Sequence, residues 1–325
     1  MQDEKFTISY ESLWKAIIRP PRDNYQKEEL GQNTFTYFSK TYHRSDYDIL
    51  ASKGNIIKSS FIELSIEDRD TLIMPVIIYL HGNSSSRIEG LHYMGDIIKR
   101  KINLFVFDFA GCGKSEGDYI SLGYHEKKDL KIIIDFVCKL PFVGKIGLWG
   151  HSMGAATSII YSHLDDRVKC LCADSSFAKF TMLAKELCSK QINLPNIIIG
   201  AAIKILNKTI SNKNGLDLIK LNPIDDVKLI NKPIYFVHAM NDELINKEHT
   251  IELFEACPCK SDKKFFTICE GGHNTARPRY LVDKICNFFQ TYLFEKIFFY
   301  GIVDFLFFLF FILFLSFFYL GFFKL

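Results

Sequence analysis

The sequence lacks the patterns that would direct the chain to a metal, a nucleic acid or a secretory route. Its nine cysteines include no Cys-x-x-Cys pair, so we expect the reduced thiols of a cytosolic domain rather than a zinc site or a set of disulfides. The formal net charge is only +3, without a basic cluster, so nucleic acid is not an expected partner. Residues 1–5 offer no basic region followed by an apolar core, and Gln2 stands where N-myristoylation needs glycine. A signal peptide and a myristoyl group are therefore not expected.

What the chain does have is enough apolar sequence for one large core, because 48% of its 325 residues are hydrophobic. Short apolar runs alternate with stretches of helical periodicity, and this alternation predicts an α/β fold with a mostly parallel central sheet and helices on both faces. An alternating pattern at Phe35 and Tyr37, and again from Ile56 to Leu64, predicts two antiparallel strands ahead of the parallel ones. We expect the parallel strands near 76–80, 104–109, 146–150, 169–174, 234–239 and 265–269.

Three regions follow from this pattern: an N-terminal arm (1–44), one α/β domain (45–293) and a hydrophobic C-terminal segment (297–325). In the arm, a short apolar turn is followed by Pro20 and Pro21, which end any helix there. We expect the arm to pack on the domain, and the alternative is a contact with a membrane surface or a partner.

Within the domain, about sixty residues separate the strand that ends near Asp174 from the one that starts at Ile234. This distance is too long for one crossover helix. We therefore expect residues 178–222 to form a small helical cap over the site. The apolar face at 192–199 contacts either an acyl chain or the interior of the cap, and the sequence leaves both interpretations open.

A Gly-x-Ser-x-Gly sequence at 150–154 follows a short apolar strand and precedes a helix that begins with small residues. In this setting Ser152 stands on a sharp strand-to-helix turn, which Gly150 and Gly154 permit because they have no side chains to clash. Backbone N–H groups at the start of the helix point towards any oxyanion that forms beside the serine. Geometry and a neighbouring base turn a serine hydroxyl into a nucleophile, so the pattern predicts that Ser152 is one.

An acid and a histidine follow in the order that such a turn requires. The strand-like run 233–239 leads to Asp242 and Glu243, and the strand-like run 264–269 leads to two glycines and His273. We predict Asp242 as the acid, with Glu243 as the alternative. We predict His273 as the general base.

The second donor of an oxyanion hole is expected in the loop after an earlier strand. The apolar run 75–80 is followed by His-Gly and a polar loop, in which Gly82 lets the backbone turn. We predict that the N–H groups of Asn83 and Met153 bind the oxyanion, and Ser84 is a less favoured substitute for Asn83.

Four pieces of the sequence make the chain resemble the alpha/beta-hydrolase superfamily. They are residues 80–83, residues 107–117, residues 150–154, and Asp242 together with His273. The second piece resembles the Asp-x-x-Gly-x-Gly-x-Ser-x-Gly loop that follows the fourth strand in this superfamily. The resemblance implies the alpha/beta-hydrolase fold and a Ser-Asp-His triad.

Within the superfamily, residues 45–293 look most like the small-capped serine hydrolases that include protein depalmitoylases and monoacylglycerol-type esterases. Ala110 stands where many members have arginine, a departure that touches no catalytic role. The glycine-rich loop does not match a phosphate-binding loop, since it has no Gly-x-x-x-x-Gly-Lys-Ser/Thr frame. No metal and no organic cofactor is implied.

The C-terminal segment is almost wholly apolar from Ile297 to Phe323, and Asp304 is its only charged residue. Residues 305–323 contain no charge and are long enough to span a hydrocarbon core of ~30 Å as a helix. We expect a tail anchor with the catalytic domain on the cytoplasmic side of a membrane. The alternatives are a gene end that reads into non-coding sequence and burial within the domain.

Taken together, these patterns predict a serine hydrolase that cleaves an acyl ester or thioester through an acyl-enzyme. A membrane anchor would bring lipid esters or palmitoyl-cysteine on proteins within reach, and the resemblance points the same way. A serine peptidase, an acyltransferase and a non-catalytic binding scaffold remain alternatives on the same fold. His238 lies in a strand-like run, so we expect it to affect stability rather than turnover.

Overall fold

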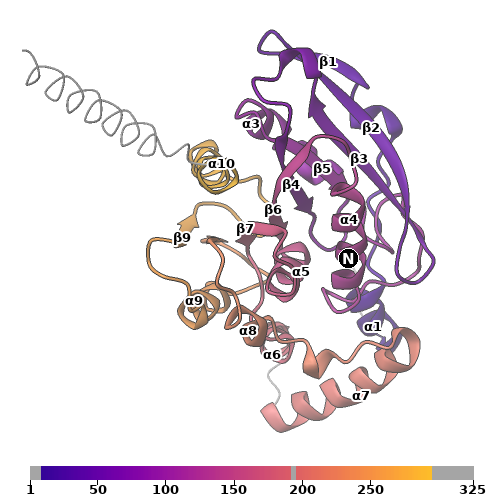
Figure 1. Ribbon diagram of the computed structural model, residues 1–325. Coiled ribbons are helices and arrows are strands. Elements are labelled where there is room, and N and C mark those ends of the chain that lie inside the picture. Colours follow the sequence, from indigo (N-terminus) through magenta and orange to yellow (C-terminus); the bar gives the residue numbers. More distant parts are fainter. Residues whose placement is uncertain (1–8, 192–194, 295–325) are drawn as a thin grey trace, which may run out of the picture. The chain divides into compact units, whose positions relative to one another are not determined.

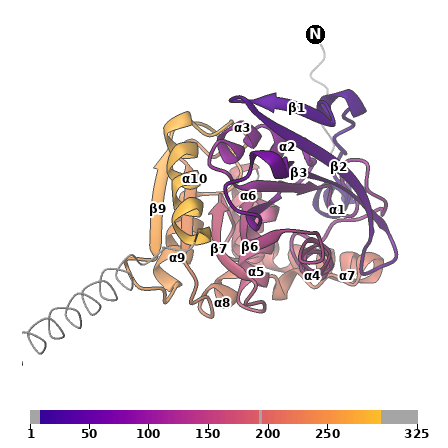
Figure 2. The ribbon, with the colours of Figure 1, turned by 45° about the horizontal axis from the view of Figure 1, so that its top comes forward.

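A mostly parallel sheet of nine strands forms the centre of the part of the chain that the computed structural model describes, residues 9–191 and 195–294 (Figure 1). The order across the sheet is β1-β2-β3-β5-β4-β6-β7-β8-β9, so β1 and β9 lie at opposite edges (Figure 2). The strands are β1 (Thr34–Tyr37), β2 (Lys40–Leu50), β3 (Ile56–Leu64), β4 (Met74–Leu80), β5 (Asn103–Phe107), β6 (Val143–His151), β7 (Val168–Asp174), β8 (Ile234–Ala239) and β9 (Lys264–Cys269). Strands β4 to β9 pair in parallel, which confirms the predicted fold class.

The antiparallel part of the sheet differs from the prediction. The sequence predicts two antiparallel strands, whereas β1, β2 and β3 are three, and β3 also pairs antiparallel with β5. The missed strand is β2, whose buried positions include the charged Arg44. This guanidinium bonds to Asp46 and to the side-chain oxygen of Asn33, 2.7 Å away. A polar residue that faces inward and is satisfied locally removes the apolar alternation by which a strand is recognised.

Helices cover both faces of the sheet, as predicted (Figure 1). Contacts join α3 and α10 on one face, whereas α4, α5, α8 and α9 form a series of contacts on the other. The helices are α1 (Tyr10–Ile18), α2 (Ile88–Leu91), α3 (Met94–Ile98), α4 (Glu126–Val137), α5 (Met153–Ser162), α6 (Phe180–Gln191), α7 (Asn196–Asn214), α8 (Pro223–Val227), α9 (Lys247–Ala256) and α10 (Arg279–Leu293). The buried helix α5 packs on β4, β6 and β7, at the centre of the sheet.

Two helices, α6 and α7, occupy most of the connection between β7 and β8. Helix α7 contacts both α6 and the N-terminal helix α1. The hydroxyl of Tyr10 in α1 lies 2.6 Å from that of Thr209 in α7, and the ammonium of Lys213 lies 4.2 Å from the centre of the Trp14 ring. Residues 192–194 of the predicted apolar face fall outside the described residues.

The predicted tail anchor, residues 297–325, also falls outside the described residues. Within residues 9–191 and 195–294, no helix combines the length and the apolar character that crossing a bilayer requires.

A buried ion pair joins the end of β7 to the segment that leads into α10. The Arg277 guanidinium donates to both carboxylate oxygens of Asp174, over 2.7 Å and 2.9 Å. Burial acts to raise the pKa of Asp174, but the charge and hydrogen bonds of Arg277 outweigh it, so this pKa lies below its usual value. The pair therefore stabilises the fold above the usual pKa of an aspartate, and its contribution is lost as the pH falls through the lowered value.

We expect Arg277→Met to lower the free energy of unfolding by about 3–5 kcal/mol, because the substitution leaves the Asp174 carboxylate buried without its partner. Urea unfolding followed by circular dichroism measures this loss. Arg19→Met is the matched control, because Arg19 is 3.7 Å from Asp118 and both side chains are more than half exposed. We expect the control to cost less than about 1 kcal/mol, and equal losses in the two variants would contradict the assignment of Arg277.

Candidate active site

The turn between β6 and α5 holds Ser152 in a backbone conformation that is unusual for an L-residue, with φ 52° and ψ −113°. A Cβ at Gly150 would clash with the backbone of Gly154, and one at Gly154 would clash with the carbonyl of Leu80. The Ser152 N–H donates to the carbonyl of Asp174 over 2.8 Å. The close approach that was predicted for Gly150 and Gly154 is confirmed, and it places the serine at the carboxyl ends of the strands.

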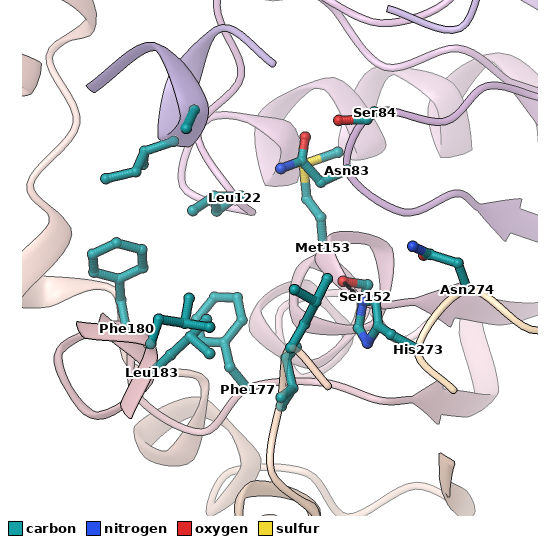
Figure 3. Close-up of a pocket in the computed structure, with 15 residues that line it drawn as sticks. Asn83, Ser84, Leu122, Ser152, Met153, Phe177, Phe180, Leu183, His273 and Asn274 are labelled. Atoms are coloured by element: carbon teal, nitrogen blue, oxygen red, sulfur yellow. Dashed lines mark hydrogen bonds between the residues drawn. The ribbon is translucent and has the colours of Figure 1, made fainter. Parts of the chain in front are cut away.

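The structure brings Ser152, His273 and Asp242 together in one chain of hydrogen bonds. Figure 3 shows Ser152 and His273 side by side. The Ser152 hydroxyl lies 2.9 Å from His273 Nε2, and His273 Nδ1 lies 2.7 Å from Asp242 Oδ2. All three side chains are buried or nearly so. These are the contacts that a general base needs on one side and an orienting acid on the other.

Of the two candidate acids, only Asp242 contacts the imidazole of His273. Its other oxygen accepts from the N–H groups of Leu244 and Ile245, over 2.9 Å and 2.8 Å. Glu243 instead accepts from the backbone N–H of His273, over 3.2 Å. Burial acts to raise the pKa of Asp242, but His273 and the backbone N–H groups outweigh it, so this pKa lies below its usual value and the carboxylate is ionised at neutral pH.

His238 lies near Asp242 but makes its hydrogen bonds to groups other than Ser152. It is fully buried, and its ring nitrogens contact the Thr250 hydroxyl at 2.7 Å and the Ile245 carbonyl at 2.9 Å. Its Nε2 is 3.6 Å from Asp242. Burial holds the pKa of His238 below its usual value. These contacts occupy both nitrogens, so the ring has no free position to accept a proton from the serine.

The residues predicted for the oxyanion hole lie beside the serine. Asn83, Ser84 and Met153 line the same pocket as Ser152 and His273 (Figure 3). Among the described residues, neither the Asn83 N–H nor the Met153 N–H donates a hydrogen bond. Both donors are therefore free for a ligand, as an oxyanion hole requires.

A cavity of about 360 Å³ opens above the serine and is lined mainly by apolar side chains. Ala16 and Ile17 of α1 contribute to the lining. Phe180 and Leu183 of α6 contribute as well (Figure 3). The remaining lining residues are Asn83, Ser84, Leu122, Ser152, Met153, Phe177, Leu187, Leu244, Ile245, His273 and Asn274. The volume and apolar lining fit a small-molecule site.

Two buried ion pairs next to the triad were not predicted from the sequence. His151 Nδ1 lies 2.8 Å from Glu89, and Arg277 bonds to Asp174 as described above. His151 directly precedes Ser152 in the sequence, and this position indicated that it would lie near the site. Glu89 is far from it along the chain and stands in a four-residue helix without a motif, so no local pattern identifies it.

No group of three or more histidine, cysteine, aspartate or glutamate side chains is placed to hold a metal ion in the described part of the chain. The nine cysteines carry free thiols, and seven of them are buried. The polar groups that remain around Ser152 fit acid–base and acyl-transfer chemistry.

Comparisons with known proteins agree with this architecture. The family model of the X-Pro dipeptidyl-peptidases (S15 family) matches residues 102–218. The chain is 28% identical over 201 residues to the uncharacterized protein YqkD of Bacillus subtilis, a match that covers 61% of this chain and 64%, less than two thirds, of that protein. It is 24% identical over 233 residues to the alpha/beta hydrolase domain-containing protein WAV2 of Arabidopsis thaliana, covering 68% of this chain and 69% of that one.

Solved structures give the same result for the fold. The Pyrococcus furiosus esterase Pf2001 superposes with a TM-score of 0.63 at 22% identity, covering 86% of this chain and 99% of that one. The sheet order, the serine turn between β6 and α5, and the acid and histidine after β8 and β9 are arranged as the predicted resemblance implies. The described residues therefore have the alpha/beta-hydrolase fold.

Proposed function

We propose that the chain is a serine hydrolase that cleaves an acyl ester or thioester through a Ser152–His273–Asp242 triad. The observation that carries this proposal is the continuous chain of hydrogen bonds from the Ser152 hydroxyl through both nitrogens of His273 to Asp242. A strained nucleophile, a base and an ionised acid at hydrogen-bond distances are the features that acyl transfer needs.

The reaction takes place in two halves. The oxygen of Ser152 attacks the carbonyl carbon while His273 Nε2 takes its proton, and the Asn83 and Met153 N–H groups bind the oxyanion. The intermediate collapses to the acyl-enzyme as the leaving alkoxide or thiolate takes the proton from His273. Water then attacks the acyl carbon and gives its proton to the same nitrogen. Release of the acid returns that proton to Ser152.

The cavity supports a substrate with an apolar acyl group. Its walls are leucine, isoleucine, phenylalanine and alanine side chains from α1 and α6. Burial of apolar surface is favourable by roughly 25 cal/mol per Å², so such walls select acyl chains over polar groups. Lipid esters and acylated cysteines on proteins are the substrate classes that combine an apolar acyl group with an ester or thioester bond.

A serine peptidase is the second candidate, because the family model that matches residues 102–218 is a peptidase family. A dipeptidyl-peptidase must hold the free amino terminus of its substrate, and a carboxylate is the natural partner for that ammonium group. The described residues that line the cavity include no aspartate or glutamate. This lining favours the ester or thioester, and dipeptide amides belong in the same substrate panel. Acyltransferase activity would require an alcohol or amine, in place of water, to attack the acyl-enzyme in the second half of the reaction.

We expect a fluorophosphonate probe to label the wild-type protein covalently and to leave Ser152→Ala unlabelled, because only an activated serine attacks the phosphorus. Mass spectrometry of the labelled peptide checks the position. Ser158→Ala is the matched control on the same helix, since its hydroxyl donates to the Gly154 carbonyl and does not contact the triad; it should label like the wild type. Folded wild-type protein that resists the probe would favour the binding-scaffold alternative.

We expect His273→Ala to lower kcat/KM for an activated ester by a factor on the order of 10⁴–10⁶, because the triad then has no base. His238→Ala should cost about 1–3 kcal/mol of stability through two lost buried hydrogen bonds. Its kcat/KM should fall by less than about tenfold, since His238 does not contact Ser152. Steady-state kinetics on both purified variants test this assignment, and an inactive His238→Ala beside an active His273→Ala would reverse it.

We expect Leu183→Trp, which narrows the cavity, to lower kcat/KM for a long-chain acyl ester by about 10–200-fold, and that for the acetate ester by much less. The chain length at which activity falls reports how far the acyl group enters. Leu164→Trp on the surface after α5 is the control, because Leu164 is 60% exposed and should leave both rates unchanged. Equal losses on the two esters would show that the cavity does not hold the acyl chain.

A further inference from the structure

His151, the residue before the nucleophile, is buried with an acceptor at each ring nitrogen. Nδ1 lies 2.8 Å from Glu89 Oε1, and Nε2 lies 3.1 Å from the backbone carbonyl oxygen of His273. A carbonyl oxygen has no hydrogen to give, so Nε2 donates to it. An ionised carboxylate is likewise only an acceptor, so Nδ1 donates to Glu89. With a hydrogen on both nitrogens, the ring is an imidazolium cation.

The surroundings of Glu89 keep its carboxylate ionised. Its carboxylate accepts from the Tyr79 hydroxyl over 2.9 Å and from the Gly82 N–H over 3.0 Å, besides His151. Burial acts to raise the pKa of Glu89, but the charge and hydrogen bond of His151 outweigh it, and this pKa lies well below its usual value. Burial acts to lower the pKa of His151, but the charge and hydrogen bond of Glu89 outweigh it, and this pKa is raised.

The ion pair joins the two loops that flank the nucleophile. Glu89 holds the N–H of Gly82, which starts the loop of Asn83, and a Cβ at Gly82 would lie only 3.0 Å from His151 Nδ1. On its other side, the imidazolium holds the carbonyl of His273. The rings of His151 and His273 lie 5.1 Å apart, inclined by 40°.

A second ion pair contacts the same carbonyl, that of His273. Arg277, which is paired with Asp174, also donates to the His273 carbonyl oxygen over 3.2 Å. The charged or titratable groups that face His151 are therefore Glu89 from α2, Asp174 from the end of β7, and His273 and Arg277 from the segment between β9 and α10. Glu89 and Asp174 are each paired with a cation, and both cations, His151 and Arg277, donate to the His273 carbonyl.

We propose that His151 is a positioning residue of the triad, a buried imidazolium that holds the His273 loop through the His273 carbonyl. This inference rests on the function proposed above, because it assigns the placement of the same base. A general base must lie within hydrogen-bond reach of the hydroxyl that it deprotonates, so a hold on the backbone of His273 acts on its contact with Ser152.

The test is the split between kcat and KM for an activated ester. In His151→Gln the cation is gone, and we expect kcat to fall by about tenfold or more while KM changes by less than about twofold, because the base is misplaced and the cavity is not. The double variant Glu89→Gln with His151→Gln leaves no unpaired buried charge, so it keeps the fold, and its kcat should fall as well. His163→Gln is the matched control, because His163 pairs with Asp226 at 3.1 Å, away from the triad; its kcat and KM should not change. A folded double variant with the kcat of the wild type would overturn the proposal.

A measurement that needs no turnover separates this inference from the proposed function. Nitrogen-15 spectra of the histidine side chains in the full chain identify the His151 signals by their loss in His151→Gln. We expect both ring nitrogens of His151 to be protonated at neutral pH, and a single-proton tautomer would refute the proposal. Wild-type protein without esterase activity would refute only the proposed function, because the protonation state of His151 in the nitrogen-15 spectra does not depend on turnover.

Discussion

At the turn that carries Ser152, three segments of backbone approach one another so closely that side chains are excluded. Gly154 lies against the carbonyl of Leu80, and Gly150 lies against Gly154 itself. This contact locks helix α5 to the ends of β4 and β6, and it fixes the unusual φ of the serine between them. The rest of the site is arranged around that fixed point, because the acid, the base and the loop of Asn83 all follow strands whose carboxyl ends meet at the same edge.

The loop that carries His273 follows β9 but is not itself part of a strand. Its position therefore depends on contacts other than the hydrogen-bond ladder of the sheet. Its backbone is held by three charged side chains: Glu243 accepts from the His273 N–H, and His151 and Arg277 donate to the His273 carbonyl. Replacing a whole buried ion pair by apolar residues often costs little, because desolvation offsets most of the attraction between the charges, although removing one partner alone is costly. Their directional hydrogen bonds, however, restrict where a carbonyl lies. The benefit of placing two such pairs here is therefore positional, and catalysis depends on sub-ångström placement of the base.

The proximity of the three proposed triad residues could be predicted from the sequence, because each follows a short apolar run that predicts a strand, and the parallel strands bring those ends together. Ser152, Asp242 and His273 are far apart along the chain, yet each has a local signal. Glu89 and Arg277 have none, since their importance comes only from the partners that folding gives them. Strand β2 was missed for a related reason. Arg44 faces inward on this strand and bonds to Asp46 and Asn33, so the sequence of β2 lacks the alternation of apolar and polar residues that predicts a strand.

Reaction chemistry and substrate selection have different structural origins in this chain. The reacting groups stand on turns that directly follow strands of the central sheet, where the backbone is fixed by its ladders of hydrogen bonds. Part of the apolar lining of the cavity comes instead from α1 and α6, of which α1 lies at the start of the described chain and α6 belongs to a long connection between strands. Helix α1 is held against α7 by the Tyr10–Thr209 hydrogen bond and by Lys213 over the Trp14 ring. Trp14 and Ile18 of α1 also pack in the main core. Sequence motifs near Ser152 therefore indicate the proposed reaction, whereas the proposed selection of an acyl group depends on a cavity lined in part by helices that carry no motif.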